Sequence, residues 1–161
     1  MRCGFLDFLM PKITLLGNSG ALWIIIAVSL LFPKKYRKHG ILLLAGLLIG
    51  AVVGNLILKN LFMRPRPCRL DPSVRLLISV PKDYAFPSGH ILSSVVAATI
   101  LTATNRRFAW AAIPLAALIS FSKLYLFVHF PSDVVAAVIL GIAIGFLVLK
   151  IGKRLLRIPQ E

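Results

Sequence analysis

Acidic side chains are scarce in this chain. Only five of its 161 residues are Asp or Glu, against 19 Lys or Arg, which gives a formal net charge of +14. So few carboxylates argue against a cluster of the kind that binds Mg²⁺ or Ca²⁺. Charged residues make up 15% of the chain and hydrophobic residues 58%, whereas soluble domains are roughly one quarter charged. The composition favours an integral membrane protein.

Cysteine is also rare, because the chain has only Cys3 and Cys68. Their separation fits no metal-binding motif, and we expect free thiols. The many cations do not form a basic domain interleaved with aromatic side chains, so no nucleic-acid partner is expected. They flank apolar runs instead, where the lipid bilayer and a lipid phosphate substrate are the expected partners.

Apolar runs account for most of the chain. We predict five transmembrane helices, over residues 20–33, 41–58, 90–104, 108–128 and 134–149. Several are shorter than the roughly 20 residues of a straight span, but flanking Lys and Arg side chains can snorkel. Residues 5–16 carry Asp7, Pro11 and Lys12 and end in a turn-like sequence, which favours an interfacial or half-inserted helix over a sixth span. A cleaved signal peptide is not expected.

The predicted fold is therefore all-α, a polytopic membrane helix bundle with six helices in all and a single domain over residues 1–161. Its orientation follows from the positive-inside rule. Three basic segments fall on one face of a five-span bundle, which should be cytoplasmic and should include the C-terminus. They hold Lys34, Lys35, Arg37 and Lys38; Arg106 and Arg107; and Lys150, Lys153, Arg154 and Arg157.

Three short motifs fall on the opposite, extracytoplasmic face. The first is Lys59-x6-Arg66-Pro67, in which Lys59 ends an apolar run. The sequence around Arg66 reads Arg-Pro-Arg-Pro, and each proline fixes its own φ and favours extended backbone before it. A guanidinium group on such a stiff strip suits bidentate binding of phosphate oxygens. A snorkelling lysine and a headgroup-binding loop are the alternatives.

The second motif is Pro87-Ser88-Gly89-His90, which opens a helix. Ser88 is a candidate N-cap residue, and Gly89 allows the backbone to approach a ligand closely. The free N–H groups and the dipole at a helix N-terminus favour an anion there, and His90 would lie on the first turn. The alternative is an ordinary helix start with an interfacial histidine.

The third motif is Ser122-Lys123-x5-His129-x3-Asp133. Pro131 suits the first turn of the last helix, which places His129 just before that helix and Asp133 in its opening turn. A carboxylate there can accept a hydrogen bond from one imidazole nitrogen and so make the other nitrogen nucleophilic. The alternative is a helix-entry Asp favoured by the macrodipole, beside an unrelated histidine.

In order and spacing, the three motifs together resemble the type 2 phosphatidic acid phosphatase superfamily of lipid phosphate phosphatases. The resemblance implies that His129 attacks phosphorus to give a phosphohistidine, that Asp133 orients it, and that His90 protonates the leaving oxygen and then activates water. It also implies phosphate binding by Lys59, Arg66, Ser88, Gly89 and Lys123. No metal or other cofactor is implied. One departure is that Lys123 stands where the signature has Arg, which removes a bidentate fork.

The compact size and outward-facing site resemble those of undecaprenyl-diphosphate phosphatases of bacteria, so we expect hydrolysis of undecaprenyl diphosphate to undecaprenyl phosphate at the cell membrane. Hydrolysis of phosphatidic acid or phosphatidylglycerophosphate is the alternative. A non-catalytic lipid-binding bundle is an alternative of another class, and it predicts no requirement for His129. Vanadate-dependent haloperoxidases share this site chemistry, but they are soluble and larger. The oligomeric state is not indicated by the sequence.

Overall fold

The computed structural model describes residues 3–71 and 73–156, and this part of the chain is helical with no strand. The α-helices are α1 (Gly4–Leu16), α2 (Ala21–Ser29), α3 (Arg37–Gly50), α4 (Lys59–Phe62), α5 (Pro67–Leu70), α6 (Gly89–Thr104), α7 (Arg106–Tyr125) and α8 (Pro131–Leu155). A 3₁₀ turn η1 (Asn18–Gly20) joins α1 to α2, and a π-helical segment η2 (Ala51–Leu58) joins α3 to α4. The predicted all-α fold is confirmed.

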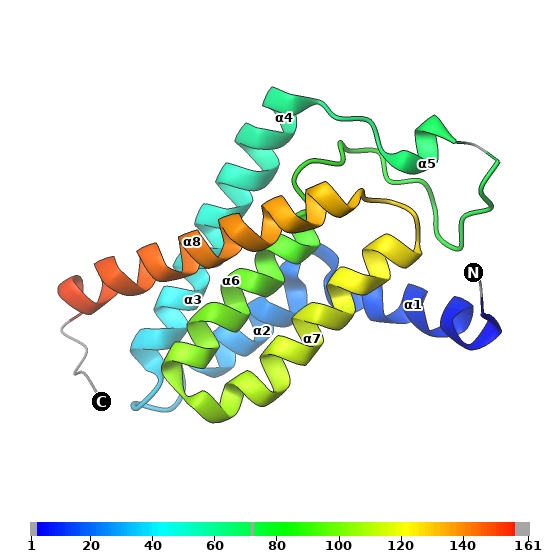
Figure 1. Ribbon diagram of the computed structural model, residues 1–161. Coiled ribbons are helices and arrows are strands. Elements are labelled where there is room, and N and C mark those ends of the chain that lie inside the picture. Colours follow the sequence, from blue (N-terminus) through cyan, green and yellow to red (C-terminus); the bar gives the residue numbers. More distant parts are fainter. Residues whose placement is uncertain (1–2, 72, 157–161) are drawn as a thin grey trace.

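Helix α6 lies at the centre of the bundle, where it packs against α3, α7 and α8 (Figure 1). Eight of its 16 residues are buried, as expected of a surrounded helix, and Ile91, Val96 and Ile100 are fully buried. Two polar side chains are buried there together, because the Trp23 indole of α2 donates a hydrogen bond to Ser94 Oγ over 2.9 Å. His90 is the second residue of this helix, so the central helix of the bundle carries one of the predicted site residues.

The outer surface of the bundle is strongly apolar. Large side chains such as Trp110, Ile139 and Phe146 are more than half exposed, which suits contact with lipid rather than water. By length and composition, three helical stretches can cross a membrane, namely Arg37–Leu70, Arg106–Tyr125 and Pro131–Leu155. The chain is therefore a multi-pass membrane protein.

The number of spans stays a prediction. The pair α1 and α2, bent by 50°, adds a fourth candidate if it counts as one span. Helix α6 has 16 residues and α2 only nine, and both are short of the roughly 20 that a straight span needs. The N-terminal helix exists as predicted, and it packs on α7, where Tyr125 Oη donates to Asp7 Oδ1 over 2.7 Å.

The two ends of the bundle differ in what they carry. Figure 1 shows the α2–α3 and α6–α7 connections and the last turns of α8 at one end, and α4, α5 and the α7–α8 connection at the other. The predicted basic segments lie at the first end, apart from Arg157, which is outside the described residues. The three motifs gather at the second end. Which side of the membrane each end faces stays a prediction.

Candidate active site

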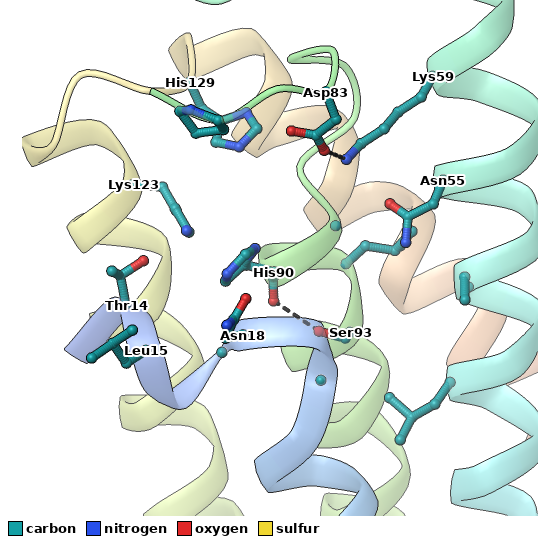
Figure 2. A pocket seen from close by; sticks show the side chains of 18 of the residues that line it. Thr14, Leu15, Asn18, Asn55, Lys59, Asp83, His90, Ser93, Lys123 and His129 are labelled. Carbon is teal, nitrogen blue, oxygen red and sulfur yellow. Dashed lines mark hydrogen bonds and ion pairs between the residues drawn. The ribbon is translucent and has the colours of Figure 1, made fainter. Parts of the chain in front are cut away.

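A cavity of about 870 Å³ lies at the motif end of the bundle. Its walls come from segments far apart in the sequence, and they include residues of all three motifs: Lys59, Arg66, Gly89, His90, Lys123 and His129. Figure 2 shows Lys123 and Lys59 on opposite sides of this cavity, with the imidazoles of His90 and His129 between them. The structure therefore brings six of the eight predicted site residues to one cavity. Ser88 directly precedes Gly89 in the chain, and Asp133 follows His129 at position i+4.

Lys59 reaches the cavity from a helix with a local change of winding. The segment η2 is π-helical over Ala51–Leu58 and ends directly before Lys59, and π-helical turns often occur at functional sites. Asn55 of this segment also lines the cavity, close to the backbone of Gly89. The Lys59 side chain is nearly buried, and its amine forms an ion pair with Asp83.

Arg66 connects the first motif to the third. It follows the extended backbone that its prolines predict, with φ −78° and ψ 150°, and it is only 4% exposed. Its Nε donates to the Asp83 carbonyl over 3.0 Å and its Nη2 to Asp83 Oδ1 over 2.6 Å. Its Nη1 lies 2.9 Å from the Val128 carbonyl and 3.0 Å from His129 Nε2.

The contact with Arg66 defines the state of His129. A guanidinium group can only donate hydrogen bonds, so Nε2 of His129 is the nitrogen with the lone pair and the proton lies on Nδ1. Burial and the charges of Arg66 and Lys123 lower the pKa of His129 to about 4, against the opposing effect of Asp133. The imidazole is therefore neutral near pH 7, with its basic nitrogen at the cavity.

Asp133 lies behind the other nitrogen of His129. Its Oδ2 is 3.6 Å from Nδ1, and the carboxylate is fully buried. This distance is longer than a hydrogen bond, but such contacts are often long in the absence of substrate. The carboxylate is held by the Phe130 N–H over 2.9 Å and by Arg64 Nη1 over 2.8 Å. Asp133 thus lies next to His129, as the third motif predicts, and its orienting role stays a prediction.

The second motif presents donors to the cavity. Ser88 is the N-cap residue of α6, but its side chain makes no capping hydrogen bond, contrary to the usual role of a capping serine. Its hydroxyl is buried and has no hydrogen-bond partner among the described residues. The N–H groups in the first turn of a helix also lack partners within the helix. A phosphate oxygen beside Gly89 would satisfy these groups.

Two charged residues at the site have contacts that the sequence does not predict. Asp83 lies in the loop before the second motif, which looks like ordinary turn material, and no spacing rule links it to Lys59 or Arg66. Arg64 belongs to the predicted phosphate-binding strip, but the structure turns it away from the cavity. Its Nη1 donates to Ser132 Oγ over 2.7 Å as well as to Asp133, and its guanidinium stacks on the Phe130 ring.

Comparison with known families identifies the family of this chain. Residues 39–157, well over half of the chain, match the model of the PAP2 superfamily. The chain belongs to the PAP2 superfamily.

Relatives of this PAP2 protein include several lipid phosphatases. It is 37% identical over 130 residues to an undecaprenyl-diphosphatase of Sulfolobus acidocaldarius, an alignment that covers 80% of this chain and 63% of the relative. The chain thus spans less than two thirds of that protein. It is also 30% identical over 143 residues to undecaprenyl-diphosphatase BcrC of Bacillus subtilis, which covers 88% of this chain and 72% of the relative.

Two solved structures share the PAP2 fold over nearly the whole chain. The phosphatidylglycerolphosphate phosphatase of Bacillus subtilis superimposes with a TM-score of 0.79 at 26% identity, covering 99% of this chain and 82% of that one. LpxE of Aquifex aeolicus superimposes with a TM-score of 0.78 at 29% identity, covering 92% and 88%. The predicted family and fold are therefore confirmed, whereas the roles of individual residues stay predictions.

Proposed function

We propose that this protein is a lipid phosphatase that transfers a phosphoryl group to His129 and then to water. The observation that carries the proposal is the state of His129, whose lone-pair nitrogen lies at a cavity lined by cations while Asp133 lies behind Nδ1. In the first step Nε2 attacks phosphorus, and the bond from phosphorus to the leaving oxygen breaks. His90 gives that oxygen a proton.

In the second step, His90 takes a proton from water as the water oxygen attacks the phosphohistidine. The bond between phosphorus and nitrogen breaks, orthophosphate leaves, and His129 is again neutral. Asp133 stabilises the positive charge that His129 acquires while phosphorus is being attacked. Three cavity cations, Lys59, Arg66 and Lys123, neutralise charge on the phosphoryl oxygens, and Ser88 and the Gly89 N–H add hydrogen bonds. We therefore propose that the reaction needs no metal.

For the substrate we propose undecaprenyl diphosphate, hydrolysed to undecaprenyl phosphate at the outer face of the membrane, with the C-terminus in the cytoplasm. The two relatives named undecaprenyl-diphosphatases support this choice. So does the cavity wall, because Ile24, Leu44 and Leu48 continue it on the apolar side and could contact a hydrocarbon chain. Phosphatidylglycerophosphate is the second candidate, since the phosphatase that hydrolyses it in Bacillus subtilis has nearly the same fold over 99% of this chain.

The first experiment measures phosphate release in detergent with EDTA present. Undecaprenyl diphosphate, phosphatidylglycerophosphate and phosphatidic acid are compared as substrates for the wild type and for His129→Ala. We expect the wild type to release phosphate, and to do so fastest from undecaprenyl diphosphate. We expect His129→Ala to release none. The exposed Lys82→Ala serves as a matched control and should behave as the wild type. Release that requires Mg²⁺, or that survives in His129→Ala, would overturn the mechanism, and no release from any lipid would favour a non-catalytic lipid-binding bundle.

A further inference from the structure

The donors of Arg66 are almost fully used before any substrate binds. Nε is bonded to the Asp83 carbonyl, Nη1 to Val128 and His129, and Nη2 to the Asp83 carboxylate. A guanidinium group has five N–H donors, so at most one remains for a ligand. A phosphate that binds Arg66 in bidentate fashion must therefore displace at least one of these four acceptors, of which two are the side chains of His129 and Asp83.

Asp83 also holds the amine of Lys59, so one carboxylate neutralises two cavity cations at once. Oδ2 pairs with Lys59 and Oδ1 with Arg66, and Figure 2 shows the first of these pairs at the wall of the cavity opposite Lys123. Asp83 itself lines the cavity. Its carboxylate thus lies where the predicted phosphate-binding groups converge. Like a phosphate oxygen of the substrate, it is negatively charged.

Asp83 is held differently from Asp133, the other carboxylate at the site. Asp133 is fully buried and is fixed by a backbone N–H and by Arg64. The Asp83 side chain is 49% exposed, and within the described part of the chain its carboxylate has no hydrogen-bond donor besides Lys59 and Arg66. If a ligand takes these two cations, nothing else keeps the carboxylate in the cavity, and water is within reach.

The backbone at Asp83 can stay in place while the side chain turns. Arg66 Nε is bonded to the Asp83 carbonyl, and the Ala85 N–H donates to the Arg64 carbonyl over 2.9 Å. These two bonds tie the loop to the first motif without using the carboxylate. Rotation of one side chain therefore suffices to free both cations, with no movement of the loop.

We propose that Asp83 is a specificity-determining residue, an internal counter-ion that only a doubly charged phosphate group displaces. A phosphodiester headgroup carries one negative charge, so exchanging it for the carboxylate gains no Coulomb energy in the site. A terminal phosphate with two charges and more acceptor oxygens gains both charge and hydrogen bonds. Asp83 would thus reject the phosphodiester lipids of the surrounding membrane and admit phosphomonoesters and diphosphates. This inference rests on the proposed function for its biological meaning.

The test measures anion binding directly, so that it does not depend on turnover. Binding of orthophosphate, and competition by micelles of phosphatidylglycerol, a phosphodiester lipid, are measured by calorimetry for the wild type, Asp83→Asn and Asp83→Glu. We expect Asp83→Asn to bind orthophosphate at least about tenfold more tightly, since a charge-assisted competitor is removed, and to become sensitive to the phosphodiester. Asp83→Glu should restore rejection of the phosphodiester. Asp71→Asn, an exposed residue of the same loop, should match the wild type.

Weaker binding of orthophosphate by Asp83→Asn would refute the proposal. If Asp83 only positions Lys59 and Arg66, Asp83→Asn will bind orthophosphate more weakly than the wild type, and the proposal is wrong. If Asp83→Asn does not fold, NMR of the wild type gives a second test. The protein is labelled with ¹³C at the carboxyl carbons of its four Asp residues. The signal that is missing from Asp83→Glu is that of Asp83. Saturating orthophosphate should shift that signal towards the value of a solvated carboxylate, and an unchanged signal refutes displacement. Failure of phosphate release with intact orthophosphate binding would count against the proposed function alone.

Discussion

At the residue scale, the contact between Arg64 and Asp133 is a feature that the motifs do not reveal. Arg64 is not among the side chains that line the cavity, yet its Nη1 holds the carboxylate behind His129. We predict that Arg64→Gln lowers kcat by roughly 10- to 100-fold, because a misplaced orienting group costs about this much. KM should change little, since Arg64 does not face the substrate. Steady-state kinetics on the preferred lipid measures both.

Lys82→Gln is the matched control for this prediction, because Lys82 is an exposed cation at the same end of the bundle. Its kinetics should equal those of the wild type. A large rise in KM with unchanged kcat in Arg64→Gln would mean that Arg64 binds substrate, as its place in the Arg-Pro-Arg-Pro strip first suggests. That outcome would contradict a purely positioning role.

The ionisation of His129 gives a second prediction at this scale. Its pKa of about 4 lies below the usual value of about 6.5, so the imidazole stays neutral as the pH falls from 7 to 5 and becomes protonated only near pH 4. Spectra of ¹⁵N-histidine-labelled protein in detergent micelles test this, since the chain has three histidines and His129→Gln identifies the signal. Titration of His129 with a midpoint near 6.5 would contradict the neutral state.

At this scale, local spacing predicts which residues are neighbours in space. His129, Pro131 and Asp133 lie within five residues, so helix-start rules alone place the carboxylate beside the imidazole. Asp83 is 17 residues from Arg66 and 24 from Lys59. It lies in a loop with no periodic pattern, so only the folded chain shows that the three meet. The same holds for Arg64, whose sequence context gave no hint that it would face Asp133, 69 residues away.

At the element scale, the contact between α6 and α8 depends on small residues. Gly141 and Gly145 lie one turn apart on α8, and added Cβ atoms would stand 2.8 Å from Val95 Cβ and 2.7 Å from Thr99 Cγ2. Such spacing allows helix backbones to approach closely in membranes. Because α6 begins within the second motif and Asp133 lies in the first turn of α8, this contact also sets the distance between the two halves of the site.

We predict that Gly145→Ile destabilises the protein by roughly 1–3 kcal/mol, the usual range for overpacking a well-filled interface. The added side chain would have to displace Thr99, and α8 would move away from α6. Thermal unfolding in detergent, followed by circular dichroism, should show a lower midpoint. Ala143→Ile, which adds a similar side chain to an exposed position of the same helix, should leave the midpoint near that of the wild type. Equal midpoints for the two variants would show that this face of α8 is not tightly packed.

Helix boundaries show what hydrophobic runs can and cannot predict. The runs at 90–104 and 134–149 correspond to α6 and α8, because an apolar run bounded by turn residues and cations leaves few alternatives. The bounds of α6 agree within one residue, whereas α8 begins three residues earlier and ends six residues later than its run. The run at 20–33 is different, since α2 covers only Ala21–Ser29 and joins α1 through a bend at Gly20, where φ is +66°. Composition alone does not distinguish a short span from half of a bent pair, nor does it reveal the π-helical winding of η2.

At the scale of the whole molecule, the predicted orientation in the membrane depends on one feature. The basic segments and the three motifs lie at opposite ends of the bundle. Lys34, Lys35, Arg106 and Arg107 flank the connections at one end, and the cavity lies at the other. From the positive-inside rule we predict that the first end faces the cytoplasm. A single domain over residues 1–161 stays a prediction of the same kind, although one main core of α2, α3, α6, α7 and α8 side chains is consistent with it.

The chain contains a natural reporter of this orientation. Cys3 and Cys68 are both free thiols, and Cys3 is exposed whereas Cys68 is buried. Cys3 lies at the motif end of the bundle, because its backbone N–H donates to the Tyr125 hydroxyl at the end of α7. We predict that a membrane-impermeant maleimide added to intact cells labels Cys3, since the motif end should face outwards. A Lys35→Cys variant in a Cys3→Ser background should be labelled only after the membrane is permeabilised. The reversed pattern would place the cavity on the cytoplasmic side, and a lipid carried in the outer leaflet could then not be the substrate.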